Sequence, residues 1–213
     1  DRVELGSFGT MQTDATVVMR VEFPDGTADP EGLDTLRWRG VAFEHFSGRE
    51  WSVSRPERRM LPRGAGGQAL LARPRGTGLL ITQEIYLEPI GSEVLFVAPR
   101  LLGVTVSGGP VLADALDAVT SPVPQARFRY RVLSELDLPV RRPTGPGRLL
   151  SGEERARYLQ LPLVSPRVRE LAREVTRLSP DQWASALRLT HHLQTTLRYS
   201  LALKRGPGVE PLE

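Results

Sequence analysis

The chain has 213 residues, of which 40% are hydrophobic, enough for one large domain or two small ones around a buried core. It contains no cysteine, which excludes disulfide bonds, thiolate metal sites and a cysteine nucleophile within these residues. The net charge is only +3, because 28 basic residues, all arginine except Lys204, are interspersed with 25 acidic ones. This mixture is typical of a solvated, ion-paired surface, so we expect no nucleic-acid partner.

The ends and the apolar runs bear on the relation to a membrane. The first residue is Asp1, and no signal-peptide pattern precedes it. The longest apolar run, residues 94–106, is interrupted by Pro99-Arg100 and is too short to span a bilayer. We therefore expect a soluble piece of a longer protein.

The N-terminal part favours β-structure. Residues 13–23 are rich in β-branched side chains and end at the turn Pro24-Asp25-Gly26, which predicts a strand. Residues 36–51 alternate apolar and polar side chains around Trp38 and reach Trp51 through the turn Ser47-Gly48. This stretch predicts a β-hairpin that carries a large aromatic area, and we expect it at the centre of a β core.

Further strands are expected along the chain to residue 138. Residues 55–78, rich in Pro, Gly and Arg, are interpreted as a long, mobile loop with one short strand at 69–72. The other predicted strands are residues 79–88, 93–98, 101–107, 111–112, 115–119 and 127–136. Short strands with regularly spaced turns indicate an immunoglobulin-like β-sandwich.

The pattern becomes helical after a linker at residues 139–147. Ser151 and Glu154 form a predicted capping box, Ser165-Pro166 begins a second helix, and Ser179-Pro180 begins a third. The last two helices carry more apolar surface than a helical pair can bury by itself, so we expect another part of the protein to cover them. The expected class is α+β, with a β-sandwich domain at 1–138, a linker with a short helical turn at 139–164 and a helical segment at 165–213.

Few side chains are candidates for chemistry. His191 and His192 are adjacent, whereas metal ligands on a helix face are three or four residues apart. His45 has Glu44 and Glu50 nearby, a candidate acid-base set, but a lone histidine in an aromatic hairpin is more often a surface or packing residue.

Three other patterns also fall short of a site. No serine lies in a nucleophile elbow, and the Gly-rich residues 64–67 lack the lysine and the helix of a phosphate loop. The arginines and aromatics of residues 127–131 are suited to grip single-stranded nucleic acid or a sugar, but the simpler interpretation places the aromatics in the core and the arginines in water. We therefore assign no catalytic, cofactor-binding or metal-binding residue, and no cofactor.

Short motifs in a fixed order resemble the extracytoplasmic region of bacterial membrane-anchored transglutaminase-like proteins. The motifs are Val3–Ser7, Val17–Val21, Trp38–Gly40, Phe46–Trp51, Leu87–Pro89, Leu95-Phe96, Tyr158–Pro162, Arg167–Ala172 and Leu193–Leu201. In that family a β-rich domain leads into a transglutaminase-like, papain-like core. The family's cysteine nucleophile would follow Glu213, so the resemblance carries no catalytic residue onto this chain.

The resemblance implies a non-catalytic, extracytoplasmic part of a cysteine acyltransferase or protease-like membrane protein, inactive by itself. The parent protein would be tethered to the membrane, at the periplasm or cell surface, and the missing core would bind a protein or peptide substrate. This part would position the core or assist substrate binding. The alternative is a stand-alone β-sandwich module that binds envelope polysaccharide or a partner protein; the substrate and the oligomeric state stay open.

Overall fold

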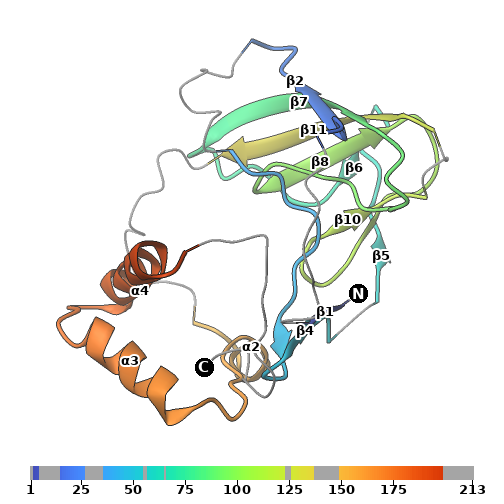
Figure 1. Cartoon of the computed structure of the whole chain (residues 1–213). Coiled ribbons are helices and arrows are strands. Elements are labelled where there is room, and N and C mark those ends of the chain that lie inside the picture. The colour runs from blue at the N-terminus through green and yellow to red at the C-terminus, as the bar shows by residue number, and fades with distance from the viewer. Residues whose placement is uncertain are drawn as a thin grey trace. The chain divides into compact units, whose positions relative to one another are not determined.

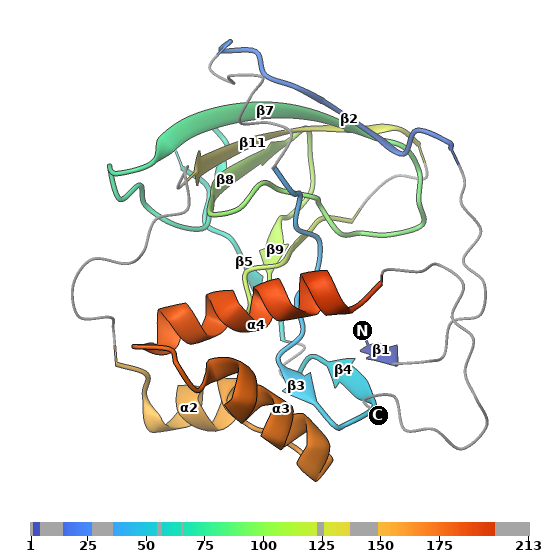
Figure 2. The same cartoon turned by 60° about the vertical axis from the view of Figure 1, so that its left-hand side comes forward.

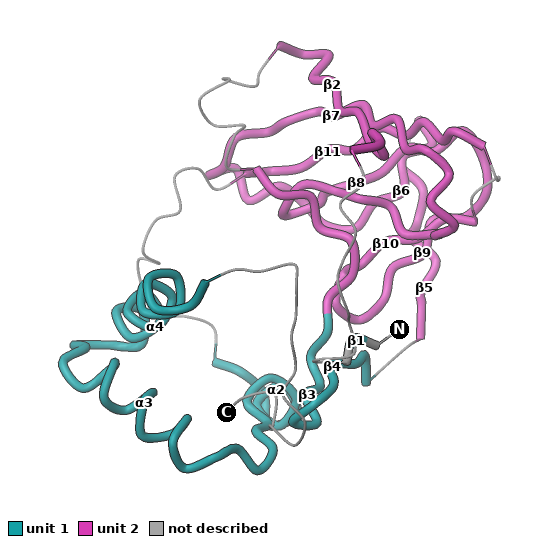
Figure 3. The backbone as a smooth tube through the Cα atoms, in the orientation of Figure 1, with its two compact units in different colours: residues 1–14, 43–54, 142–213 teal, residues 15–42, 55–141 magenta. Residues whose placement is uncertain are grey.

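The computed structural model describes residues 2–4, 15–26, 36–54, 57–64, 66–122, 126–136 and 149–198. These residues form eleven β-strands, all paired antiparallel, and three α-helices. Two compact units result, and neither is continuous in sequence (Figure 3). Unit 1 comprises residues 1–14, 43–54 and 142–213, and unit 2 comprises residues 15–42 and 55–141.

A five-stranded sheet is the main element of unit 2 (Figure 1). Its order is β2 (Met19–Glu22), β7 (Leu79–Leu87), β11 (Phe128–Leu136), β8 (Leu101–Val106) and β6 (Ala69–Leu70). The nine-residue strands β7 and β11 pair along their whole length. The register between β11 and β8 shifts after Leu133, where β8 has an extra residue, so that β11 loses its strict alternation beyond this bulge.

A second sheet of unit 2 has the order β10 (Val119–Thr120), β9 (Leu112–Ala113) and β5 (Arg59–Met60). β9 and β10 form a hairpin close to the strands predicted at 111–112 and 115–119, and Asp114 Oδ1 fixes its turn by accepting hydrogen bonds from the backbone N–H groups of Leu116 and Ala118. The predicted strand at 93–98 is found only as isolated bridges, Val94 with Thr120 and Arg39 with Val97.

The core of unit 2 lies on one face of the five-stranded sheet. Alternation places Phe128, Tyr130 and Val132 inward, as predicted, against buried side chains from both sheets. A smaller cluster contains Leu36, Ile81, Ala98 and Leu136, and Trp38 packs against both clusters.

A chain of hydrogen bonds runs through this core. Trp38 Nε1 donates to Gln83 Oε1 (3.0 Å), Gln83 Nε2 donates to Ser134 Oγ (3.4 Å), and Ser134 Oγ donates to the carbonyl of Ala98 (3.3 Å). Gln83 and Ser134 are fully buried, and these bonds supply the partners that buried polar groups need.

Unit 1 combines a small sheet with the helices (Figure 2). The sheet has the order β1 (Arg2–Glu4), β4 (Glu50–Ser52) and β3 (His45–Phe46), and the helices are α2 (Gly152–Tyr158), α3 (Pro166–Thr176) and α4 (Gln182–Thr196). The capping box of Ser151 and Glu154 is formed as predicted, and Ser165 caps α3 with Pro166 in its first turn. Asp181, rather than Ser179, caps α4, because its carboxylate accepts the hydrogen bond of Ala184 N (2.8 Å).

Two predictions about the N-terminal part are wrong. The aromatic stretch 36–51 is not one hairpin at the centre of the core, because Trp38 lies in unit 2 whereas the stacked pair Phe46 and Trp51 lies in unit 1. The loop predicted for residues 55–78 is interrupted in its first half, since the described residues form β5 and bury Leu61, whereas the short strand predicted at 69–72 is found as β6. The predicted boundary at residue 138 stays a prediction, and residues 43–54 belong to the compact unit that contains the helices.

Candidate functional site

The histidines that the sequence singled out do not assemble a catalytic set. His45 Nδ1 lies 3.5 Å from Ser52 Oγ across β3 and β4. The carboxylate of Glu44 is buried and accepts hydrogen bonds from the backbone N–H (2.9 Å) and the hydroxyl of Ser54, so the structure does not bring it to His45.

On α4, His191 is exposed and His192 half-buried. Both line an open hollow of about 460 Å³ with Val175, Leu187, Arg188 and Thr195. No carboxylate lines this hollow, and the described residues contain no group of three metal-ligating side chains. Each helix in the described ranges is too short or too polar to cross a bilayer.

Two of the family-like motifs are brought together in unit 1. Gln160 lies against the edge of β3, and with its amide oriented to satisfy both atoms it accepts from Phe46 N (2.8 Å) and donates to Phe46 O (3.1 Å). Gly48 lies in the turn of the hairpin and has a φ of +103°, and Pro162 is the residue beside it. The segment after α2 is therefore fastened to the hairpin, which explains why motifs far apart in sequence share one structural role.

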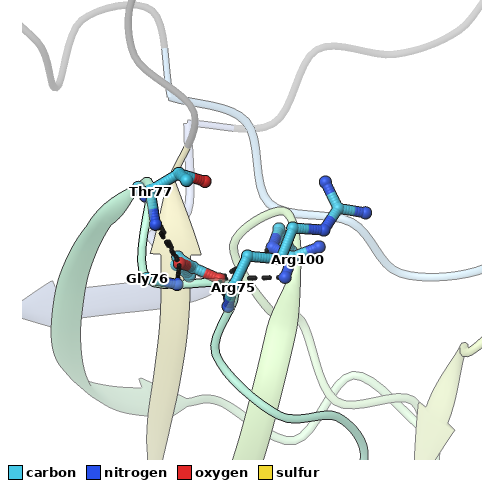
Figure 4. Close-up of polar contacts among 6 residues, drawn as sticks. Arg75, Gly76, Thr77 and Arg100 are labelled. Carbon is cyan, nitrogen blue, oxygen red and sulfur yellow. Dashed lines mark hydrogen bonds and ion pairs between the residues drawn. The ribbon is translucent and has the colours of Figure 1, made fainter. Parts of the chain in front are cut away.

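A buried carboxylate in unit 2 was missed by sequence reasoning. Glu135 is fully buried, and its oxygens accept hydrogen bonds from the backbone N–H groups of residues 75–78 at 2.7 to 3.3 Å (Figure 4). The guanidinium of Arg100 binds Glu135 Oε2 through Nε at 3.0 Å and Nη2 at 2.9 Å. The left-handed backbone of Arg100 (φ 56°) also lets its carbonyl accept the N–H of Glu135 (3.1 Å), so one residue holds both the main chain and the side chain of Glu135.

These donors explain the acidity of Glu135. The backbone N–H of Arg75, the guanidinium of Arg100 and the N–H groups of Gly76 and Gly78 together outweigh burial and lower the pKa of the Glu135 carboxyl to about 2. The cluster ties the loop before β7 to Glu135 of β11 and to Arg100, just before β8, which gives it a structural role. The sequence signal was a paired Gly76 and Gly78 before a strand, but nothing local connected it to a glutamate almost sixty residues away.

The outward face of the five-stranded sheet carries two Arg–Glu–Arg groups. Glu84 binds Arg129 (2.6 Å) and Arg131 (3.5 Å), and Glu88 binds Arg127 (2.6 Å) and Arg20 (3.4 Å). The hydrogen bond from Arg129 is the main reason that the pKa of the Glu84 carboxyl is lowered. The arginines of residues 127–131 thus point to water, as the simpler interpretation predicted, and each of the two carboxylates is shared between two arginines.

A hollow of about 230 Å³ adjoins this face of unit 2. It is lined by residues from the turn after β2, from the approach to β6, and from β7 and β11: Pro24, Asp25, Gln68, Thr82, Arg131 and Leu133. No sequence pattern grouped these residues, because each of the four segments carries only one or two of them.

Comparisons with known proteins identify the family. A family model described as the TgpA N-terminal domain matches residues 1–141. The crystal structure of the periplasmic domain of TgpA from Pseudomonas aeruginosa is 22% identical, with a TM-score of 0.63 over 99% of this chain and 66% of that chain. The same domain bound to ethylmercury is also 22% identical, with a TM-score of 0.55 over 84% of this chain and 57% of that one.

The chain therefore spans less than two thirds of either solved relative. No curated protein matches it. The structural likeness shows a shared, mostly antiparallel β fold with helices, and the family match covers most of the chain. The resemblance read from the sequence motifs is thereby confirmed, and the chain belongs to the TgpA N-terminal domain family.

Proposed function

We propose that this chain is the non-catalytic, extracytoplasmic part of a transglutaminase-like membrane protein, and that it positions a catalytic core or assists its substrate binding. The observation that carries the proposal is the family match over residues 1–141, with the fold of the solved relative continuing through the helices. Because that relative is described as a periplasmic domain, we place this chain in the periplasm or at the cell surface, tethered through its parent protein.

The helices support the second half of the proposal. None of α2, α3 and α4 contains a buried residue, and Leu163, just before α3, is fully exposed. Apolar helix faces of this kind are expected where a larger core covers them. We therefore interpret α2–α4 as the start of a papain-like core, and unit 2 as an immunoglobulin-like sandwich whose two sheets share one hydrophobic cluster.

In this proposal the chemistry lies outside these residues. Acyl transfer by this class of enzyme needs a thiolate that attacks an amide or peptide carbonyl, and the chain has no cysteine. What unit 1 offers is a junction, since Gln160 binds the hairpin through two hydrogen bonds to Phe46 and Pro162 lies beside Gly48. Such a junction would fix where the helices of the core begin.

The test uses the product of the whole reading frame, treated with labelled iodoacetamide and a labelled amine donor. We expect one cysteine to be alkylated selectively, and amine incorporation to be lost after alkylation. The 213-residue chain is the matched control and should show neither reaction. A full-length product without thiol-dependent acyl transfer would overturn the enzymatic half of the proposal.

A further inference from the structure

We infer that the hollow on the outward side of unit 2, defined by Pro24, Asp25, Gln68, Thr82, Arg131 and Leu133, binds one ring of a neutral saccharide. This site is independent of any acyl transfer by the parent protein. It gives a chemical class to the binding-module alternative that the sequence left open.

A glycine on β8 makes room for the side chain of Gln68, which lines the hollow. Gly103 on β8 has no Cβ, and an added Cβ would lie 2.8 Å from Gln68 Cδ and 2.9 Å from Gln68 Cγ. The side chain of Gln68 therefore lies over the backbone of Gly103. On the opposite rim, a tight turn with Gly26 N donating to Phe23 O (3.1 Å) presents Asp25.

The lining combines donors and acceptors in the way that sugar hydroxyls require. Arg131 donates only, Asp25 accepts only, and the amide of Gln68 and the hydroxyl of Thr82 do both. Pro24 and Leu133 add an apolar surface for the C–H face of a ring. A few oriented polar groups on an apolar wall are typical of small-molecule sites.

Charge and size narrow the ligand class. The single carboxylate of Asp25 offsets the guanidinium of Arg131, which is also bound to Glu84 at 3.5 Å, so neither a polyanion nor a cation finds a net opposite charge here. The hollow of about 230 Å³ is smaller than typical ligand pockets of roughly 300 to 1,000 Å³. It fits one sugar ring, with the rest of a glycan extending into solvent.

The test is an NMR titration of the ¹⁵N-labelled 213-residue chain with three probes: the disaccharide of N-acetylglucosamine, maltose, and the anionic polymer polygalacturonate. With at least one neutral probe we expect saturable shifts in the side-chain amide of Gln68 and the backbone amides of Thr82 and Leu133. A dissociation constant on the order of 1 mM is expected for so few contacts.

Variants locate the site. Gln68→Ala and Arg131→Ala should each weaken binding by roughly tenfold, since each removes hydrogen bonds to the ligand. Thr82→Val keeps the shape and removes only the hydroxyl, which covers the case in which Gln68→Ala fails to fold. Arg127→Ala is the matched control, because it removes an exposed arginine from the same sheet face, outside the hollow, and should leave binding unchanged.

Three results would overturn the inference. One is the absence of shifts with both neutral probes up to about 20 mM, well above the expected constant. Another is neutral-probe binding that none of the hollow variants weakens. The third is binding of the polyanion alone with equal losses in Arg127→Ala and Arg131→Ala, which would assign the arginines to a general anionic surface.

Discussion

Unit 2 and the helices of unit 1 bury their apolar side chains to very different degrees. Nearly all the buried hydrophobic side chains of the described residues belong to unit 2, where both sheets share one cluster. The helices have clear apolar faces but no buried residue. Sequence periodicity therefore predicts that a helix forms, but the burial of its apolar face depends on a partner surface that the periodicity does not identify.

The largest expected effect comes from the same substitution made in both regions. Leu95→Ala, at a fully buried site of unit 2, should lower the free energy of unfolding by about 3 kcal/mol, through lost transfer energy and the cavity left behind. Leu193→Ala, on α4 where the side chain is 50% exposed, should cost less than about 1 kcal/mol. Urea unfolding of both variants measures the difference, and equal losses would show that α4 is covered after all.

Glu135→Gln should lower the melting temperature at neutral pH on the order of 5 °C, because four backbone N–H groups and Arg100 lose a charged acceptor. The pKa of Glu135 is about 2 in the folded chain, below its ordinary value of 4.5, so the carboxylate stabilises unit 2 fully above pH 4.5. That contribution is lost as the pH falls from 4.5 toward 2. Between pH 4.5 and 2, the melting temperature of the wild type should fall more steeply with pH than that of the variant. Identical slopes would contradict the role assigned to Glu135.

Gln160→Ala should act locally in unit 1. Loss of the two hydrogen bonds to Phe46 should raise the exchange rate of the Phe46 amide by roughly fivefold, the equivalent of about 1 kcal/mol. Gln194→Ala, on the exposed side of α4, is the control and should leave that amide unchanged. If the two variants behaved alike, the junction between the hairpin and the segment after α2 would not contribute to stability.

Arg127→Ala should have the smallest effect. Its ion pair with Glu88 is short at 2.6 Å, but the arginine side chain is 61% exposed, and surface pairs contribute little. The free energy of unfolding should change by less than about 0.5 kcal/mol, and less still in high salt. A loss comparable to that of Leu95→Ala would mean that the charged face, and not the core, holds unit 2 together.

The sequence predicted elements well where local pattern and environment agree. Strands β7 and β11, the capping box of α2 and the N-cap of α3 were all expected, because alternation and caps depend on near neighbours. The split of the aromatic stretch 36–51 between two units was not expected. Alternation predicts that one face of a strand is buried, but it does not identify the surface that covers that face. The hollow and the Glu135 cluster also escaped prediction, because their residues meet only after long-range pairing.

Residues 43–54 belong to unit 1 although unit 2 residues flank them in sequence, and this arrangement affects the order in which the chain can fold during synthesis. Gln160, which satisfies the outer edge of β3, is made 116 residues after Glu44. At translation rates of about 5 to 20 residues per second, the hairpin waits roughly 6 to 23 s on the ribosome before that partner exists. During this interval the nascent chain carries the Phe46 and Trp51 pair without Gln160, while residues 55–141 of unit 2 are being synthesised. Unit 1 therefore cannot be completed until its last segment, residues 142–213, has been synthesised.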